Sequence, residues 1–538
     1  MTVLLLLSCY LPMKIERVDC LTSQDCASAF EQNAICNVET GFCEDCSSNA
    51  QCWREYGKGF ECKNSADEDA DDSYVSEEPY SSCELVPATE RCSSSLPDDD
   101  SENLSSSKDP YFIGQMFDAG LQADVIPDIA KISGADLAFQ SIREQTWLDD
   151  RDVVVISCDY GNDDDSLIDG LTEADAVGAV ADYLVNRFGI NVIVGPAGSG
   201  DVRAAYNTAQ SNAVFISPSA TSPDLTDLED YSFSDETPGT IWRTVSSDEL
   251  QAKVLAFSMS LHPEENERVG IIYQSGLYGD AFRNILAQSL GLQGTAAVVA
   301  VEYEAGDQEN IEEALDTLLT GDTEITKVAF ISSDVNDIIE FIEEIDRDVA
   351  YANTRFYLTD SAAKDSVITN ISSTLQNNDD LRNRIIGTKP ALPQEDADLY
   401  ADFSTRLLAE YNLEASNNVY AAYTYDAAWL AFLGIAWNHY NGTGSAQDIA
   451  LGLRNISDQN EQPVPLSTGG LDEILSAFEM GRSVNIFGAS GDLDYSSDTE
   501  EVQNAVELWT IDESIQIQTT HICEDATQEA CTELPTSD

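Results

Sequence analysis

Short apolar runs alternate with amphipathic segments along the chain from Tyr111 onward. Each run has the length and the β-branched content of a buried strand. The segments between them carry apolar residues at helical spacing, as at Ile338, Ile342 and Ile345, which is typical of a helix packed on a core. This alternation predicts βαβ units, parallel sheets and helices that flank them. The predicted strands are residues 153–157, 191–194, 214–217, 269–273, 298–303, 327–331 and 356–359.

The alternation continues for about three hundred residues, which is more than a single sheet usually holds. We therefore expect two α/β lobes. A break between them is predicted at residues 242–245, because this extended run follows the turn-rich residues 235–239. A new helix is expected directly after the break, since Ser247, Asp248 and Glu249 form a good N-terminal capping sequence.

Two of the predicted strands end in loops rich in glycine, proline and hydroxyl residues, at residues 195–199 and 218–223. The carboxyl ends of parallel strands lie at one edge of a sheet, where backbone N–H groups and helix N-termini act as hydrogen-bond donors. Open α/β folds bind their ligands at this edge. The two loops therefore predict a small-molecule site.

The composition permits large cores but excludes some partners. The chain has 538 residues and is 43% hydrophobic, which is enough for two or three domains. Its 98 acidic residues face only 26 basic ones, so the formal net charge is -72. Such a surface repels nucleic acid and anionic membranes, and we exclude a nucleic-acid partner.

The sequence lacks a recognisable catalytic motif. Its three histidines, His262, His439 and His521, lie far apart, and their spacing fits neither a zinc site nor a nucleophile with its base. Paired carboxylates are so common in this chain that they do not indicate a glycosidase. We expect a protein that is not an enzyme and has no metal or cofactor, with a hydrolase as the less favoured alternative.

The N-terminal segment has the cysteine pattern of a disulfide-rich module. Nine of the 13 cysteines lie between residues 20 and 92, and successive gaps of six and ten residues occur twice. A zinc site is the alternative, because Cys43 and Cys46 form a C-x-x-C pair, but the repeated gaps do not reproduce this pair. We expect disulfides of open connectivity and hence an oxidising compartment. The candidates are Cys20, Cys26, Cys36, Cys43, Cys46, Cys52, Cys62, Cys83 and Cys92.

The remaining cysteines have other expected roles. Cys523 and Cys531 are expected to close a small terminal loop, and Cys158 is either a buried thiol or a partner for the N-terminal module. Residues 6–9 resemble a bacterial lipobox, so Cys9 is a candidate lipid anchor. The apolar run there is too short to span a membrane. No basic residue precedes it, which leaves a truncated start open.

Residues 65–108 are rich in Asp, Glu and Ser and poor in apolar residues. Too little apolar surface is available to offset the entropy of ordering, so we expect an acidic linker. A calcium-binding loop is the alternative, but the acidic clusters lack the glycine and the final glutamate of that motif.

Six segments between Tyr111 and Ile522, about three quarters of the chain, resemble the periplasmic type I solute-binding proteins of the branched-chain amino-acid-binding kind. The segments occur in the family's order. The resemblance implies two α/β lobes, joined by three crossovers, that close on a small ligand. The segments are residues 194–199, 216–223, 242–244, 278–280, 423–427 and 488–495.

The resemblance also implies where the ligand carboxylate binds. The family holds it with two loops of the first lobe, which correspond here to Ser199 with Gly200 and to Ser219, Ala220 and Thr221. The residues themselves agree with this role, because hydroxyl and backbone N–H donors at a helix N-terminus suit a carboxylate. Helix capping is the structural alternative for Ser199 and Thr221.

In the family the second lobe supplies an aromatic residue, here Tyr278, and an acidic residue that meets the ligand ammonium group. Ser361 occupies the expected acidic position and Asp360 stands next to it, so both are candidates. The family has a more aromatic segment at the position of residues 332–334, which are polar in this chain. A zwitterionic amino acid is therefore the leading ligand, with other small carboxylates as alternatives.

Three other polar residues are expected to be structural. Tyr425 and Asp426 are placed on a helix of the first lobe near the hinge. Residues 488–495 are expected to form a loop and a strand near the last crossover. Ser490, within them, has no accompanying base and is not expected to be a nucleophile.

The resemblance implies a monomeric solute-binding protein of the periplasm or outer cell surface that serves an ABC-type permease. A sensory ectodomain for a signalling partner is the alternative, because the cysteine-rich segment is unusual for a transport protein. The expected domains are a signal remnant at 1–9, the disulfide module at 10–64, the linker at 65–108, lobe 1 at 109–245 and 392–475, lobe 2 at 246–391 and 476–522, and a tail at 523–538.

The spread of acidic residues along the chain predicts a halophilic or marine protein. Salt shortens the Debye length from about 10 Å at 0.1 M to about 3 Å at 1 M, which relieves repulsion among surface carboxylates. The melting temperature is therefore expected to rise steeply with NaCl concentration in thermal denaturation. A flat response would refute this adaptation.

Overall fold

A computed structural model of the chain describes most residues after Pro110 and part of the N-terminal segment. The chain divides into an N-terminal unit and a larger unit that holds both lobes. The candidate cysteines Cys9, Cys20 and Cys26 lie outside the described residues. The described residues are 35–37, 42–46, 52, 60–64, 81–85, 92–95, 110–118, 128–144, 148–149, 151–161, 172–226, 228, 237–261, 268–294, 298–306, 308–319, 325–347, 349–377, 379–393 and 397–534.

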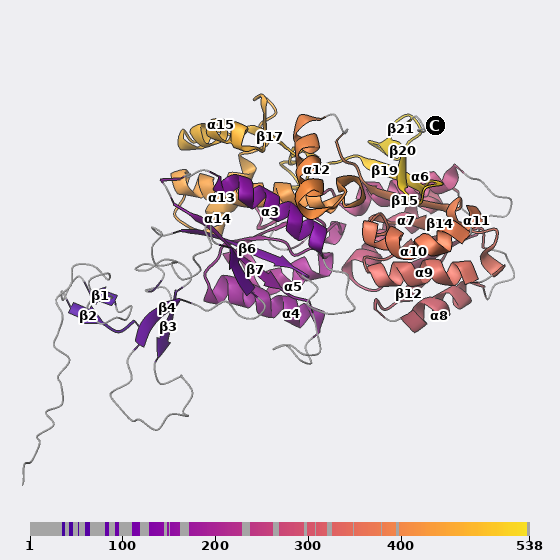
Figure 1. Cartoon of the computed structure of the whole chain (residues 1–538), viewed down its shortest axis with the longest axis horizontal. Coiled ribbons are helices and arrows are strands. Elements are labelled where there is room, and N and C mark those ends of the chain that lie inside the picture. The colour runs from indigo at the N-terminus through magenta and orange to yellow at the C-terminus, as the bar shows by residue number, and fades with distance from the viewer. Residues whose placement is uncertain are drawn as a thin grey trace, which may run out of the picture. The chain divides into compact units, whose positions relative to one another are not determined.

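The first lobe is built on a six-stranded sheet (Figure 1). Five strands are parallel, and the edge strand β5 pairs antiparallel with β7. In spatial order the strands are β10 (Ile241–Arg243), β9 (Val214–Ser217), β8 (Val192–Val194), β6 (Tyr111–Phe117), β7 (Val153–Asp159) and β5 (Cys92–Ser95).

Helices cover the first sheet because alternate strand residues point to opposite faces. Ile113 and Phe117 belong to the core that includes α3 (Ile129–Arg143) and α13 (Tyr420–Asn441). Helix α13 is buried over most of its length, as its apolar residues on all sides require. The other helices of this lobe are α4 (Glu173–Ala181), its π-helical continuation η1 (Asp182–Arg187), α5 (Ser199–Ala209), α12 (Asp398–Tyr411), α14 (Ala446–Arg454) and α15 (Thr468–Glu479).

The second lobe contains an eight-stranded sheet with two distinct halves. Its first five strands are parallel, and the last three add as antiparallel neighbours. In spatial order they are β12 (Val298–Tyr303), β11 (Val269–Gln274), β13 (Lys327–Ile331), β14 (Arg355–Leu358), β15 (Ile385–Pro390), β19 (Val506–Ile511), β20 (Ile517–Cys523) and β21 (Cys531–Glu533).

Two separate cores cover the faces of the second sheet. Val328 and Phe330 pack with one group of helices, whereas Ala329 and Ile331 pack with the other. The first group is α8 (Gln308–Leu319), α9 (Val335–Arg347), α10 (Asp365–Asn377) and α11 (Asp379–Arg382). The second group is α6 (Asp248–Ser260) and α7 (Leu277–Leu292). No helix in the described part of the chain has both the length and the apolar composition that a membrane crossing requires.

The predicted α/β class with two lobes is confirmed, and each predicted strand is present within two residues of its expected bounds. Helix α6 begins at Asp248, directly after the predicted break. The remaining short elements are β16 (Pro463–Pro465), β17 (Asn485–Gly488), β18 (Gly491–Asp492), η2 (Gln210–Asn212), η3 (Pro223–Leu225), η4 (Val349–Tyr351), η5 (Asp360–Ala362) and η6 (Ala415–Asn417).

Three expected domain boundaries differ from the structure. Residues 476–502 were assigned to lobe 2, but Ile486, Leu493 and Val502 pack in the core of the first lobe. The chain reaches the second sheet only at β19. The expected tail contains the end of β20 and β21, which extend the second sheet, and the expected linker contains β5 and β4 (Ser81–Leu85). The hydrophobic pattern of the sequence does not reveal these strands, because they are too short to show a clear alternation of apolar and polar residues.

The disulfide prediction is confirmed for eight of the eleven candidate cysteines, namely Cys36, Cys43, Cys46, Cys52, Cys62, Cys92, Cys523 and Cys531. Cys158 pairs with Cys92, which ties β5 to β7, and Cys523 pairs with Cys531. Cys158 is therefore not a free thiol, but its partner Cys92 lies in the expected linker and in the larger unit, not in the module expected at residues 10–64. Cysteines 36, 43 and 52 are also disulfide-bonded.

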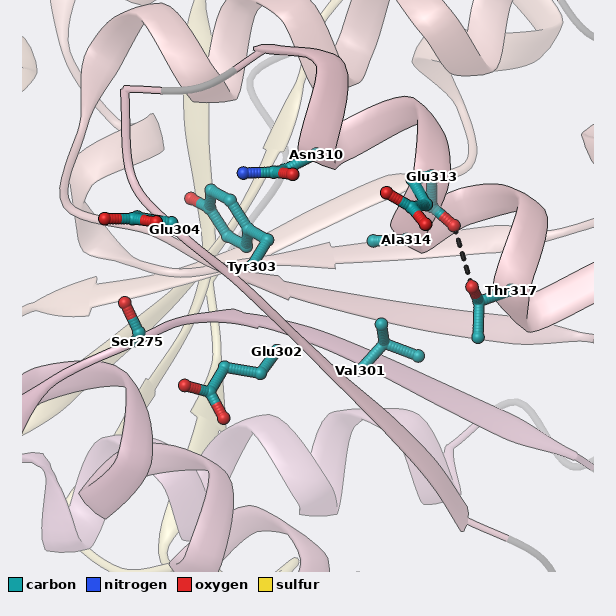
Figure 2. Close-up of a pocket in the computed structure, with 9 residues that line it drawn as sticks. All are labelled: Ser275, Val301, Glu302, Tyr303, Glu304, Asn310, Glu313, Ala314 and Thr317. Carbon is teal, nitrogen blue, oxygen red and sulfur yellow. Dashed lines mark hydrogen bonds between the residues drawn. The ribbon is translucent and has the colours of Figure 1, made fainter.

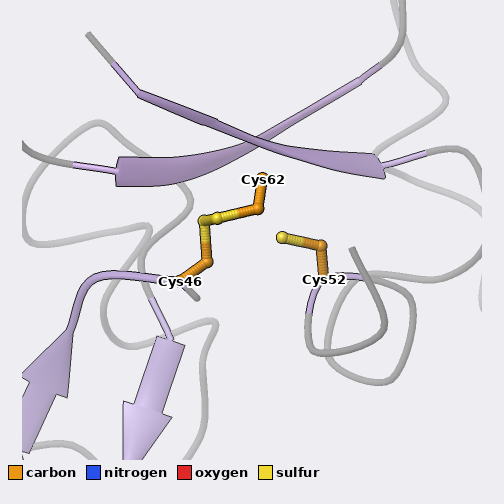
Figure 3. Close-up of side chains that lie close together, drawn as sticks. All are labelled: Cys46, Cys52 and Cys62. Atoms are coloured by element: carbon orange, nitrogen blue, oxygen red, sulfur yellow. A yellow bond between two sulfur atoms is a disulfide. The ribbon is translucent and has the colours of Figure 1, made fainter. Parts of the chain in front are cut away.

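The N-terminal unit contains two small hairpins, β1 (Ile35–Asn37) with β2 (Phe42–Glu44) and β3 (Phe60–Asn64) with β4. Cys46 pairs with Cys62, and Figure 3 shows the Cys52 sulfur beside this disulfide. The three sulfur atoms lie within 4.8 Å of one another, as metal ligands also do. All three are disulfide-bonded, however, and oxidised sulfur does not supply the thiolate that zinc needs. The structure favours disulfides over zinc.

Asp426 on α13 holds the turn between β17 and β18. Its carboxylate accepts bonds from the backbone N–H of Ala489 and of Ser490, both at 2.8 Å, and from the Ser490 hydroxyl at 2.5 Å. A side chain at Gly488 would collide with this carboxylate. Burial raises the pKa of Asp426 to about 7, while the Ser490 and Ala489 donors lower it. Ser490 is thus structural, as expected.

Replacement of Ser490 with alanine is expected to destabilise the fold more at pH 8 than at pH 5. The folded-state pKa of Asp426 is raised above its usual value of 3.8, so the stabilisation gained from its protonation is present at low pH and is lost as pH rises through about 7. Above that pH the lost donor leaves a charged carboxylate less satisfied, at a cost of about 1.5–3 kcal/mol. Equal losses in urea denaturation at both pH values would contradict this role.

Candidate functional site

The loops after β8 and β9 are joined at the carboxyl edge of the first sheet. The Ser217 hydroxyl donates to the Pro196 carbonyl at 2.6 Å, and the Ser219 hydroxyl donates to the Ala197 carbonyl at 3.0 Å. Gly195 adopts a φ of +95°, and a Cβ there would lie 2.2 Å from the Met116 carbonyl oxygen. Only glycine fits this approach. The two loops therefore form one rigid edge.

Ser199 and Thr221 do not cap helices. The N-cap residues are Gly198 for α5 and Ser222 for η3. The Ser199 hydroxyl accepts a bond from the Ser222 N–H at 3.1 Å, which leaves its own proton available to donate. Ser199 and Thr221 are both buried, with 5% and 2% of their surfaces exposed, respectively. The capping alternative is excluded by the cap positions.

On the second lobe, Asp360 begins η5 directly after β14 and accepts three hydrogen bonds. Gln251 of α6 and Tyr278 of α7 donate to its Oδ1 at 2.9 and 3.3 Å. Tyr420 of α13 donates to its Oδ2 at 2.6 Å. Because α13 belongs to the first lobe, this carboxylate links the two lobes. Asp360, rather than its neighbour Ser361, takes this central position.

Both tyrosine hydroxyls at Asp360 remain donors. Burial raises the pKa of Tyr278 and of Tyr420 well above the usual value of 10, and the Asp360 charge raises both further. The phenols therefore stay protonated and point their protons at the carboxylate. Sequence reasoning did not identify Gln251 or Tyr420, since their role depends on contacts made by the folded lobes.

Asp248 is a second buried carboxylate, at the start of α6. Its backbone N–H donates to the Thr221 carbonyl at 2.8 Å, which brings the two residues together across the lobes. Among the described residues, neither Asp248 side-chain oxygen has a hydrogen-bond partner. Burial raises its pKa well above 3.8 and Asp360 adds to the rise, whereas Thr221 and Arg243 lower it. Thr221 is thus close enough to act on the charge without meeting hydrogen-bond geometry.

The role of Asp248 was missed because the sequence around it matched a helix start so well. Ser247, the N-cap residue of α6, makes no side-chain cap bond in the structure. One feature of the sequence could have pointed to Asp248 as a site residue. It is an acidic residue in the first turn of α6, the helix with which the chain enters the second lobe after the first crossover.

Further bonds join the lobes around this group. The Ser222 hydroxyl donates to the Leu277 carbonyl at 3.0 Å, and the amides of Asn417 and Asn418 donate to Asp365 at 2.8 and 2.9 Å. The structure therefore brings Thr221, Asp248, Tyr278, Asp360 and Tyr420 to one place where the lobes meet. Gly200, by contrast, is exposed on the first turn of α5.

Arg243, at the end of β10, holds the loop that follows β9. Its guanidinium donates to the carbonyls of Ala220 and Ser222 at 3.2 and 2.8 Å and forms an ion pair with Glu501. Burial lowers the pKa of Arg243 to about 10, so it stays charged at neutral pH. The loop that carries Ala220 and Thr221 is thus fixed by a buried charge.

A separate cavity of about 440 Å³ lies between β12 and α8 of the second lobe. Figure 2 shows its acidic lining, with Glu302 and Glu304 on one side and Glu313 on the helix. The lining contains none of the predicted ligand-binding residues. This cavity is therefore distinct from the group at the lobe contact.

The sequence matches a protein-family model described as the receptor family ligand-binding region over residues 137–514. A search of curated proteins finds no match.

Several solved structures are similar in fold. Isoleucine-bound LivJ of Streptococcus pneumoniae is 16% identical with a TM-score of 0.54, and the match covers 76% of this chain and 99% of LivJ. The leucine-binding protein LivK of Thermotoga maritima is 13% identical with a TM-score of 0.55, covering 77% and 98%. A benzoate-bound solute-binding protein of R. palustris is 12% identical with a TM-score of 0.55, covering 79% and 98%. At these identities the likeness establishes the fold.

Replacement of Arg243 with methionine is expected to destabilise the protein by about 3–5 kcal/mol, because removal of one partner of a buried ion pair leaves the other uncompensated. The matched control is Arg347→Met on α9, where an exposed arginine contacts three glutamates and the expected loss is below about 1 kcal/mol. Denaturant unfolding measures both. Similar small losses in the two variants would contradict a supporting role for Arg243.

Proposed function

Because the chain belongs to the receptor ligand-binding family of type I periplasmic binding proteins, we propose that it captures an α-amino acid between its two lobes. The observation that carries this proposal is the unpartnered Asp248 carboxylate opposite Thr221. A buried carboxylate without a partner is costly, and a ligand cation would relieve that cost. The predicted amino-acid ligand supplies such a cation in its ammonium group.

The opposite side of the site suits the ligand carboxylate. Ser199 retains a free hydroxyl proton at the start of α5, where the helix dipole and backbone N–H groups favour an anion. Ser219 and Thr221 lie on the neighbouring loop. An α-amino acid would thus place its carboxylate on the first lobe and its ammonium group toward Asp248 and Asp360.

Closure of the lobes would make these contacts strong. Charge-assisted hydrogen bonds gain strength where water is excluded, and the ligand would favour the closed form by binding it more tightly than the open one. The bonds of Asp360 to Tyr420 and of Ser222 to Leu277 are of the kind that hold such a form. Binding and closure would therefore be coupled.

Transport by an ABC-type permease is the proposed use of the closed form, at the periplasmic or outer cell surface. The disulfides support an oxidising location. Lipid attachment at Cys9 would tether the protein there, and a monomer would suffice. A sensory ectodomain remains the second candidate, because the cysteine-rich segment lies outside the family match at residues 137–514.

Thermal-shift screening of the full chain against amino acids, their amides and small carboxylates tests the proposal. For a ligand found in this way, Ser199→Ala and Thr221→Ala are each expected to weaken binding by about 1–3 kcal/mol, because a hydrogen bond to a charged group is lost. Calorimetric titration measures the affinity. The matched control is Ser258→Ala, a buried serine on α6 that bonds only within its helix. If both site variants bind as tightly as the wild type, the site assignment is wrong.

A further inference from the structure

Strand β12 forms a free edge of the second sheet. Among the described residues it pairs only with β11, so its outer side carries no strand. The Tyr303 carbonyl accepts a bond from the Ser275 N–H at 2.8 Å and therefore faces β11. Successive residues of a strand direct their backbone groups to alternate sides, so those of Ala300 and Glu302 face outward. Both residues are exposed, and their backbone groups are available to another chain.

The cavity of about 440 Å³ described above lies along this edge. Four consecutive residues, from Val301 to Glu304, line it, although alternate side chains of a strand point to opposite faces. A cavity over one face would be lined by every second residue, so this cavity borders the edge itself. One face of α8 forms its other wall, because the lining residues there are spaced by three and four. They are Asn310, Glu313, Ala314 and Thr317 (Figure 2). We call this space the β12 groove.

The carboxylates of the β12 groove are not used by the fold. Glu302, Glu304 and Glu313 are all exposed, and none forms an ion pair among the described residues. Glu302 accepts a bond from the Tyr273 hydroxyl at 3.4 Å. The three carboxylates do not gather within 4.8 Å of one another, as the ligands of one metal ion would. This spread of negative charge suits an extended cation.

One buried donor of the groove wall is also unsatisfied. Tyr303 is 3% exposed, and its hydroxyl has no hydrogen-bond partner among the described residues. Burial raises the pKa of Tyr303, and the charge of Asp337 raises it further, so the hydroxyl keeps its proton. Asp337 and Ser332 are thus close enough to affect this hydroxyl without meeting hydrogen-bond geometry. The groove wall therefore contains an unused side-chain donor beside the unpaired backbone groups.

We propose that the β12 groove binds an extended peptide with basic side chains, which adds to the sheet as a strand beside β12. Main-chain hydrogen bonds to the outward groups of β12 would provide affinity, and lysine or arginine side chains would meet the three glutamates. A second copy of this chain is a poor occupant, because it carries the same net charge of -72. The groove shares no residue with the amino-acid site, so this inference is independent of the proposed function.

The test uses the full chain and a short fluorescent peptide of alternating lysine and valine. An N-methylated form of this peptide keeps the charges but has no backbone N–H to pair with a strand. The unmodified peptide is expected to bind at least about 10-fold more tightly than the N-methylated form, because several main-chain hydrogen bonds are lost. Fluorescence anisotropy at fixed salt measures both affinities, and spermidine serves as a competitor that has charge but no backbone.

Two variants separate the backbone edge from the charge. Ala300→Pro replaces an outward N–H with a ring and is expected to weaken peptide binding about 10-fold, whereas the control Ala300→Thr keeps the N–H and the affinity. Proline is tolerated on an edge strand where its nitrogen faces solvent. The double variant Glu302→Gln/Glu313→Gln is expected to weaken binding by a similar factor. Its control is Asp472→Asn/Glu473→Gln, which removes the same charge from exposed positions on α15.

Equal losses in the two double variants would assign binding to the overall negative charge and overturn the proposal. Equal affinity of the two peptides, or displacement by spermidine as effective as by the unlabelled peptide, would overturn the strand pairing. So would an absence of binding, or a dimer of this chain that Ala300→Pro abolishes. If Ala300→Pro does not fold, as measured by circular dichroism, the N-methylated peptide and the charge variants still decide. Amino-acid binding is expected to be unchanged throughout, so failure here leaves the proposed function intact.

Discussion

The carboxylate of Asp360 accepts hydrogen bonds from both lobes, and this shared acceptor is what the rest of the site depends on. Gln251 and Tyr278 fix it from the second lobe, and Tyr420 reaches it from the first. With Asp360 so engaged, the nearby Asp248 is left with no partner among the described residues. The meeting of the lobes thus buries a carboxyl group whose two oxygens have no hydrogen-bond partner among the described residues, and a ligand cation beside it would stabilise its charged form.

A buried arginine of the first lobe fixes one of the loops that form this site. Arg243 binds the carbonyls of the loop that carries Thr221, and its charge is balanced by Glu501. Asp426 plays the reverse part in the same lobe, where its carboxylate accepts hydrogen bonds from the N–H groups of Ala489 and Ser490. These two buried charges fix loops that carry little apolar surface.

Much of the fold could be predicted from the sequence because apolar runs of four to seven residues leave few alternatives to a buried strand. Strands β9 and β13 are buried throughout and have the bounds that their hydrophobic runs predict. The exceptions have physical reasons. Strand β5 is polar, and a disulfide and strand pairing hold it on the sheet. Residues 484–493 pack on the first lobe through scattered apolar contacts that have no period to detect.

The candidate site could be predicted only in part. Ser199, Ser219 and Thr221 follow strands, so their place at one sheet edge could be inferred from spacing. Asp248 and Tyr420 acquire their roles from contacts across the lobes, and α13 looks in sequence like any buried helix. Asp248 also matched a helix-start signal, and this structural role was enough to explain an acidic residue at that position, so a ligand-binding role was not considered. Contacts between elements that lie far apart in the chain cannot be inferred from the local pattern of a single sequence.

A crystal structure of the protein grown with its highest-affinity amino acid tests the central claim most directly. The account predicts the ligand ammonium group within about 3 Å of Asp248 and the α-carboxylate at the hydroxyls of Ser199 and Thr221. A ligand bound elsewhere, or a closed protein in which Asp248 is still without a partner, would contradict it.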